Sequence, residues 1–148
     1  MYLNQLRKEK KKKRALIKLE KNTTNSNIAL TLTEKVTLSS PVFLFEFTND
    51  MSLSTSYYVI SADTSTETQR YNLFEITEGV DDPENGSVIL GLEGFYKYNV
   101  YEQATGSTNL DPTGLTLVES GKMRLGGTTQ TFVKNEISNE YIAHNPSV

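Results

Sequence analysis

The side chains that most often carry out chemistry in proteins are scarce in this chain. Its 148 residues include one histidine and no cysteine, which excludes disulfides, thiolate zinc sites and cysteine nucleophiles. A catalytic histidine needs an orienting acid and a shaped pocket, whereas His144 lies in a polar tail beside Asn145 and Pro146. We therefore interpret His144 as an exposed tail residue, and we predict no enzyme activity and no cofactor.

Two short motifs resemble ligand sites without meeting their requirements. Asp81, Asp82 and Glu84 could donate oxygens to calcium, but their spacing does not fit a calcium loop with glycine at its sixth position. Gly91 and Gly94 lack the following lysine and helix that a phosphate loop needs. The acidic motif is predicted to be a solvated turn, and no metal site is expected.

Aromatic residues are the next candidates for binding, because exposed tyrosines can stack on sugar rings. The tyrosines concerned fall in segments with strand character: Tyr57, Tyr71, Tyr96, Tyr98 and Tyr101. Packing within a core explains at least Tyr96 and Tyr98 equally well. A carbohydrate-binding module is therefore kept as an alternative interpretation.

Positive charge is concentrated at the N-terminus. Residues 1–22 hold nine basic and two acidic residues, a net charge of +7, and the rest of the chain holds six basic and sixteen acidic residues, a net charge of −10. Such an asymmetry is typical of an interaction tail on an acidic body, and the partner should be negative. The residues predicted to anchor the chain to a partner are Leu3, Leu6, Arg7, Lys8, Lys10, Lys11, Lys12, Lys13, Arg14 and Lys18.

The basic arm, residues 1–22, is predicted to be α-helical. It is rich in good helix formers, and no glycine or proline occurs before residue 41. Its leucines form two small apolar patches rather than a continuous stripe, so an isolated helix would fray and would gain its shape from a partner. A fluctuating, solubilising tail remains the alternative.

From residue 28 onward the apolar period becomes two, which predicts half-buried strands. Seven strands are expected, with a bulge between Leu73 and Phe74 and a bulge or tight hairpin at Ser120 and Gly121. The segments expected to form them are 28–38, 42–48, 57–60, 70–77, 87–92, 95–103 and 115–125. Their spacing favours a mainly β, immunoglobulin-like antiparallel β-sandwich.

A local motif supports that fold. Leu92, Gly94 and Tyr96 stand where a tyrosine corner requires them. In this corner, a tyrosine at the start of the sixth strand donates its hydroxyl to nearby backbone. A structural tyrosine corner is therefore predicted at Tyr96.

The resulting organisation has three parts: a basic helical arm at 1–22, a β-sandwich at 23–125 and an extended arm at 126–148. The last part could add a strand to a neighbouring subunit's sheet or remain a loose tail. No apolar run exceeds the four residues 42–45, so neither a transmembrane helix nor a signal peptide is expected.

The body also resembles a known group of proteins. The motifs FxFxFTND (43–50), YYV (57–59), RYNxFEI (70–76), YxVYEQ (98–103) and LVESGK (117–122) are similar to small structural proteins of tailed bacteriophages, particularly crAss-like and related phages of Bacteroidetes-type hosts. The resemblance covers about residues 40–125. It implies location in the virion, as a capsid decoration, head-fibre or neck and tail component.

This resemblance and the charge pattern lead to one working interpretation. The body would be displayed on a virion and would be attached to other virion proteins through the basic arm and the sheet edges, as part of a homo-oligomer. Non-specific contact of the arm with packaged DNA is possible on charge grounds, and no membrane contact is expected. An intracellular regulator that binds nucleic acid through the arm is a further alternative.

Overall fold

The computed structural model describes residues 16–53 and 55–127, and this part of the chain is mainly β. The strands are β1 (Ile17–Glu20), β2 (Ser26–Leu30), β3 (Val42–Asn49), β4 (Ser56–Ser61), β5 (Asn72–Glu78), β6 (Ser87–Val88), β7 (Gly94–Gln103) and β8 (Thr116–Gly126). One short 3-10 helix, η1 (Pro83–Asn85), lies between β5 and β6. None of the described residues forms a helix long and apolar enough to cross a membrane.

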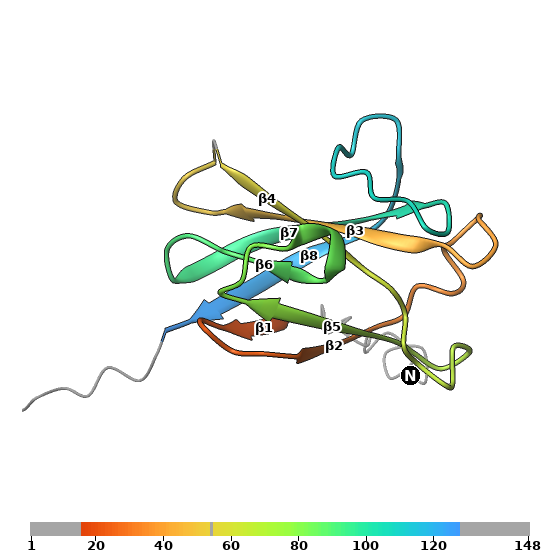
Figure 1. Cartoon of the computed structure of the whole chain (residues 1–148), viewed down its shortest axis with the longest axis horizontal. Helices are drawn as coiled ribbons and strands as arrows, with labels where there is room; N and C mark the ends of the chain where they lie inside the picture. Colours follow the sequence, from red (N-terminus) through yellow and green to blue (C-terminus); the bar gives the residue numbers. More distant parts are fainter. Residues whose placement is uncertain (1–15, 54, 128–148) are drawn as a thin grey trace, which may run out of the picture.

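The strands form two sheets. The larger sheet has the order β1-β8-β7-β3-β4, and the smaller has the order β2-β5-β6 (Figure 1). Most neighbours are antiparallel, but β1 runs parallel to β8 and β6 runs parallel to β5. The expectation of a purely antiparallel arrangement is thus wrong at these two pairs.

One core joins the two sheets. Phe43 and Phe45 of β3 meet Phe74 of β5 edge to face, with ring centroids 5.2 and 5.1 Å apart. The period of two in β3 puts Phe43, Phe45 and Phe47 on this face, and all three are buried. Aromatic rings are therefore the main contact between the sheets.

The predicted helix is absent from the end of the basic arm that the structure describes. Ile17 and Leu19 alternate with Lys18 and Glu20 and are buried, at 4% and 1% exposure, as β1 pairs with β8. Tertiary pairing of an apolar strand face outweighs the modest helix propensity of these residues. The sheet therefore includes residues that precede the boundary predicted at residue 23. Residues 1–15 and 128–148, with most of both predicted arms, lie outside the described residues.

Some strand limits also differ from the prediction. The strand expected over 28–38 ends at Leu30, because the N–H groups of Lys35 and Val36 both donate to the carbonyl of Leu32 and form a turn. The strand expected over 87–92 is only the two-residue β6.

Both predicted irregularities are misplaced. Strand β5 pairs with β2 without a register shift through Leu73 and Phe74. The apolar pattern only seemed to change phase there, because the inward positions at the two ends of the strand hold the polar residues Asn72 and Glu78. Strand β8 is continuous through Ser120 and Gly121. The bulge lies beside them instead: Glu119 opposes Val100 and Leu117 opposes Tyr101, so Val118 is the extra residue.

Candidate attachment surface

The first described strand forms one edge of the larger sheet. Its partner is β8, with Ile17 opposite Met123 and Glu20 opposite Gly126, and the Lys21 N–H continues the ladder to the Gly126 carbonyl at 3.0 Å. Because backbone groups alternate in direction along a strand, those of Lys18 and Glu20 point away from β8. No described strand pairs with them there. The edge can therefore accept an incoming strand.

A shallow hollow accompanies this edge. It has a volume of about 210 Å³ and lies between β1 and β2. The residues that line it are Leu16, Ile17, Lys18, Asn27, Ile28 and Ala29. Leu16 is 44% exposed although it is a large apolar residue. The exposed Leu16 would offer apolar contact to a side chain of an added strand, beside the backbone partners of β1.

Cationic side chains gather on the solvent face of β1 and of the next two strands of the larger sheet, β8 and β7. We call this the cationic face and define it by Lys18 of β1, Lys122 and Arg124 of β8, and Phe95 and Lys97 of β7. All five residues are exposed. The register sets Lys18 beside Arg124, Arg124 beside Phe95, and Lys97 beside Lys122. Strand pairing thus produces a positive surface on a body whose described residues include fifteen carboxylates and seven cations.

The corner that positions β7 contains the expected tyrosine contact. The Tyr96 hydroxyl donates to the Leu92 carbonyl at 2.5 Å, and the Asn49 side-chain amide donates to the same oxygen at 3.5 Å. Gly94, at a φ of +128°, lets the chain turn between them. Burial raises the pKa of the Tyr96 hydroxyl, which therefore stays a donor well above neutral pH. These contacts fix the start of β7, one residue before Phe95.

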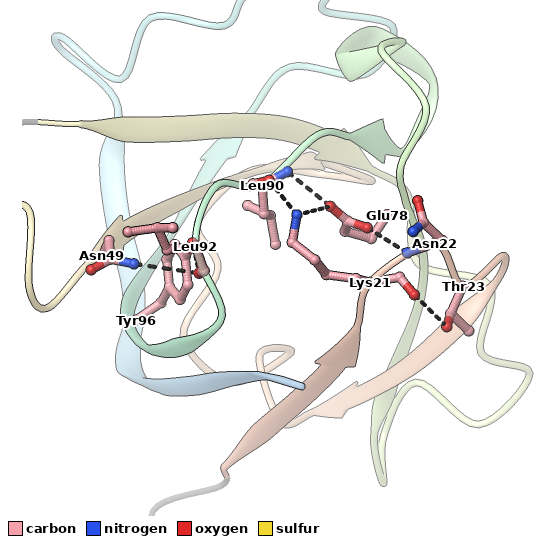
Figure 2. A network of polar contacts seen from close by, with 8 residues as sticks. All are labelled: Lys21, Asn22, Thr23, Asn49, Glu78, Leu90, Leu92 and Tyr96. Carbon is pink, nitrogen blue, oxygen red and sulfur yellow. Dashed lines mark hydrogen bonds and ion pairs between the residues drawn. The ribbon is translucent and has the colours of Figure 1, made fainter. Parts of the chain in front are cut away.

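The turn after β1 is fixed by a buried carboxylate (Figure 2). Glu78 is 2% exposed and accepts the N–H of Asn22 at 2.6 Å and that of Leu90 at 3.1 Å. The Lys21 amine lies 3.9 Å from Glu78 and donates to the Leu90 carbonyl at 3.3 Å. The turn after the edge strand is thereby joined to the end of β5 and to Leu90, two residues after β6.

Sequence reasoning and structure agree only partly on the site residues. Of the ten residues predicted to anchor the chain, Lys18 lies among the described residues, exposed on β1, and the other nine lie outside them. Phe95, Lys97, Lys122 and Arg124 were not singled out from the sequence. Their alternation within two strands was visible there, but only the β7–β8 register brings them together.

The residues considered for metal, phosphate or catalytic sites in the sequence can be compared with the described structure. No group of three or more potential metal ligands occurs in them, and His144 lies outside them. The space beside Gly91 is filled by the Tyr57 hydroxyl. Asp82 accepts the Asn85 side-chain amide at 3.0 Å within the acidic turn.

The five tyrosines singled out from the sequence do not line one exposed surface. Tyr96 and Tyr98 are buried in the core, and Tyr57 packs against the Tyr96 ring at 6.4 Å. Tyr101 lies on the opposite face of β7, where its hydroxyl donates to Glu46 at 3.4 Å. Tyr71 is 38% exposed just before β5. A stacking platform for sugars would need several of these rings side by side on the surface.

Comparison with known proteins gives no family. No family model and no curated protein matches the chain. A solved structure described as a putative glycoside hydrolase from Bacteroides vulgatus is similar at a TM-score of 0.40 and 10% sequence identity. The match covers 77% of this chain and 17% of that one, so the chain spans about a sixth of that protein's length.

Proposed function

We propose that the chain is a structural component of a tailed-phage virion, of the capsid-decoration or head-fibre type. The observation that carries this proposal is the position of β1. The strand begins three residues after Arg14, the last of the basic residues at 10–14, and forms an edge of the larger sheet with which no further described strand pairs. The chain thus has a charged contact and a backbone contact in succession.

We also infer that the body is an immunoglobulin-like β-sandwich. The strand order β1-β8-β7-β3-β4 beside β2-β5-β6, the shared core and the Tyr96 contact support this assignment. The motifs that resemble phage structural proteins occupy β3, β4, β5, β7 and β8. Such a body supplies a rigid unit for display, while the attachment lies at its edge.

Two weak contacts in one chain strengthen each other. A basic segment is attracted to an acidic protein surface or to packaged DNA, but the attraction is screened by salt. Strand addition at β1 is short-ranged and less sensitive to salt. When the first contact forms, the second becomes intramolecular and gains effective concentration.

The test is immunogold electron microscopy of purified particles from cultures that express the chain. We expect gold labels on the head for a decoration or head-fibre protein, whereas labels at the neck or tail would indicate the neighbouring virion role. Absence of the chain from particles, by labelling and by mass spectrometry, contradicts the proposal.

Two variants test the mode of attachment. Replacing the five basic residues at 10–14 by Gln should release the chain from particles, because the charged contact is lost. Replacing Lys35 and Arg70, which lie outside the arm, by Gln should leave it attached. Equal retention of both variants would show that the basic arm does not attach the chain.

A further inference from the structure

We propose that the cationic face binds the acidic turn of a second copy of this chain, so that copies associate head to tail. We define the acidic turn by Asp81, Asp82 and Glu84, next to the exposed apolar residues Val80 and Ile89. The inference deepens the proposed function, since it names one of the partners in the assembly. Its test uses the isolated chain and no virus particles, so the inference and the proposed function can fail separately.

Folding alone does not account for the cationic face. Lys18 stands beside Arg124, and Lys97 stands opposite Lys122. Like charges in cross-strand positions destabilise a sheet. Asp50 neutralises Lys122, with its carboxylate oxygen 2.7 Å from the amine. The remaining three cations have no carboxylate within ion-pair distance among the described residues.

The three described cations outside the cationic face are all paired with carboxylates. Each lies within 4 Å of a carboxylate in the described part of the chain: Lys21 and Glu78 at 3.9 Å, Lys35 and Glu119 at 3.7 Å, and Arg70 and Glu67 at 3.4 Å. Among the described residues, unpaired cations are therefore confined to the cationic face. Their charge is available to a partner.

An aromatic residue lies within the cationic face. Phe95 is 54% exposed and is the cross-strand neighbour of Arg124. Phenylalanine and arginine are both enriched at protein interfaces relative to the rest of the surface. The partner surface should therefore be acidic and should also present apolar side chains.

The acidic turn meets both requirements. Val80 and Ile89 are each 51% exposed, and in the described residues no cation is paired with its three carboxylates. Helix η1, within this turn, contacts β4, the edge of the larger sheet opposite β1. The two complementary surfaces thus lie towards opposite edges of one body. Contact between unlike surfaces gives a ring if the rotation closes and a filament if it does not.

The experiment is sedimentation velocity of the full chain across ionic strength. At about 0.01 M salt the Debye length is about 30 Å, so charges on two molecules attract over that distance. We therefore expect species larger than a monomer. At about 1 M salt the Debye length is only about 3 Å, so this attraction is screened. We therefore expect monomer. Monomer at every salt concentration and at high protein concentration would overturn the inference.

A charge exchange identifies the surfaces. The variant Lys97→Glu/Arg124→Glu and the variant Asp81→Lys/Glu84→Lys should each be monomeric at low salt, with association at least about tenfold weaker than that of the unaltered chain. Their equimolar mixture should associate again, because every face then meets an opposite charge. Circular dichroism should show the same β content in all variants.

The control is Lys35→Glu/Arg70→Glu, which makes the same charge change at two described cations outside both the cationic face and the basic arm. We expect this variant to associate as the unaltered chain does. Loss of association in this control as well would show that net charge, and not the cationic face, governs association. A mixture of the two charge-exchange variants that stays monomeric would also contradict the proposed pairing.

Discussion

At the scale of single residues, Tyr98 and Gly121 show how closely the larger sheet is packed. The two residues are directly opposite on β7 and β8, and Tyr98 is 1% exposed. A Cβ atom on Gly121 would lie 2.8 Å from three atoms of the Tyr98 ring and hydroxyl. Gly121 therefore provides room for a neighbouring ring, which explains why a strand continues through a glycine that suggested a bulge or turn.

This contact predicts that Gly121→Ala lowers the free energy of unfolding by about 1–3 kcal/mol, because overpacking forces the ring or backbone to move. Urea unfolding followed by circular dichroism measures the change. Gly126→Ala is the matched control on the same strand, since a Cβ there meets its nearest atom at an ordinary 3.6 Å. Equal effects of both substitutions would contradict the role assigned to Gly121.

Tyr98 also predicts how stability depends on alkaline pH. Burial, with a smaller contribution from the charge of Glu119, raises its pKa from 10.0 to about 12. Because the folded state raises this pKa, it favours the neutral hydroxyl. The corresponding stability is fully present below pH 10 and is lost as pH rises through about 12, at about 1.4 kcal/mol per pKa unit.

Urea unfolding at several pH values tests this dependence. We expect the free energy of unfolding to fall above pH 10 in the unaltered chain and to fall less steeply in Tyr98→Phe. Tyr71→Phe, at an exposed position outside the core, serves as the control and should behave as the unaltered chain. An identical pH slope in Tyr98→Phe would contradict the assignment.

At the scale of elements, β1 shows what the sequence could and could not predict. Alternation of Ile17 and Leu19 with charged residues was visible in the sequence, but four residues are too few to outweigh the helix-forming composition around them. Their partner, β8, lies about a hundred residues further along the chain. Long strands with their own period, such as β3 and β7, could be predicted because their pattern is local.

The Glu78 contacts predict the cost of releasing β1. In Glu78→Gln, the new NH₂ group cannot accept, so the N–H of either Asn22 or Leu90 loses its partner. We expect the free energy of unfolding to fall by about 1–3 kcal/mol. Glu75→Gln is the control, because Glu75 is an exposed carboxylate on the same strand.

Amide hydrogen exchange locates the effect of that substitution. Exchange in residues 17–22 should accelerate more than exchange in β3, since the lost contacts hold the turn after β1. A uniform acceleration over the whole chain, or an equal effect of Glu75→Gln, would contradict a local role for Glu78.

At the scale of the whole molecule, the mainly β class followed from periodicity, whereas the surface that we propose for attachment did not. The charge asymmetry between the basic arm and the body indicated a tail with a negative partner. It did not indicate that cations from β1, β7 and β8 share one face, because that depends on register. Nor did it indicate that the sheet begins within the arm.

We propose that the basic residues before β1 serve attachment and add nothing to the stability of the body. The free energy of urea unfolding of two shortened chains tests this division. Removing residues 1–14 should change it by less than about 0.5 kcal/mol. Removing residues 1–20 should lower it by about 3 kcal/mol or more, because buried Ile17 and Leu19 are lost. If the shorter deletion destabilises the chain as much as the longer one, the basic residues belong to the folded body and the account is wrong.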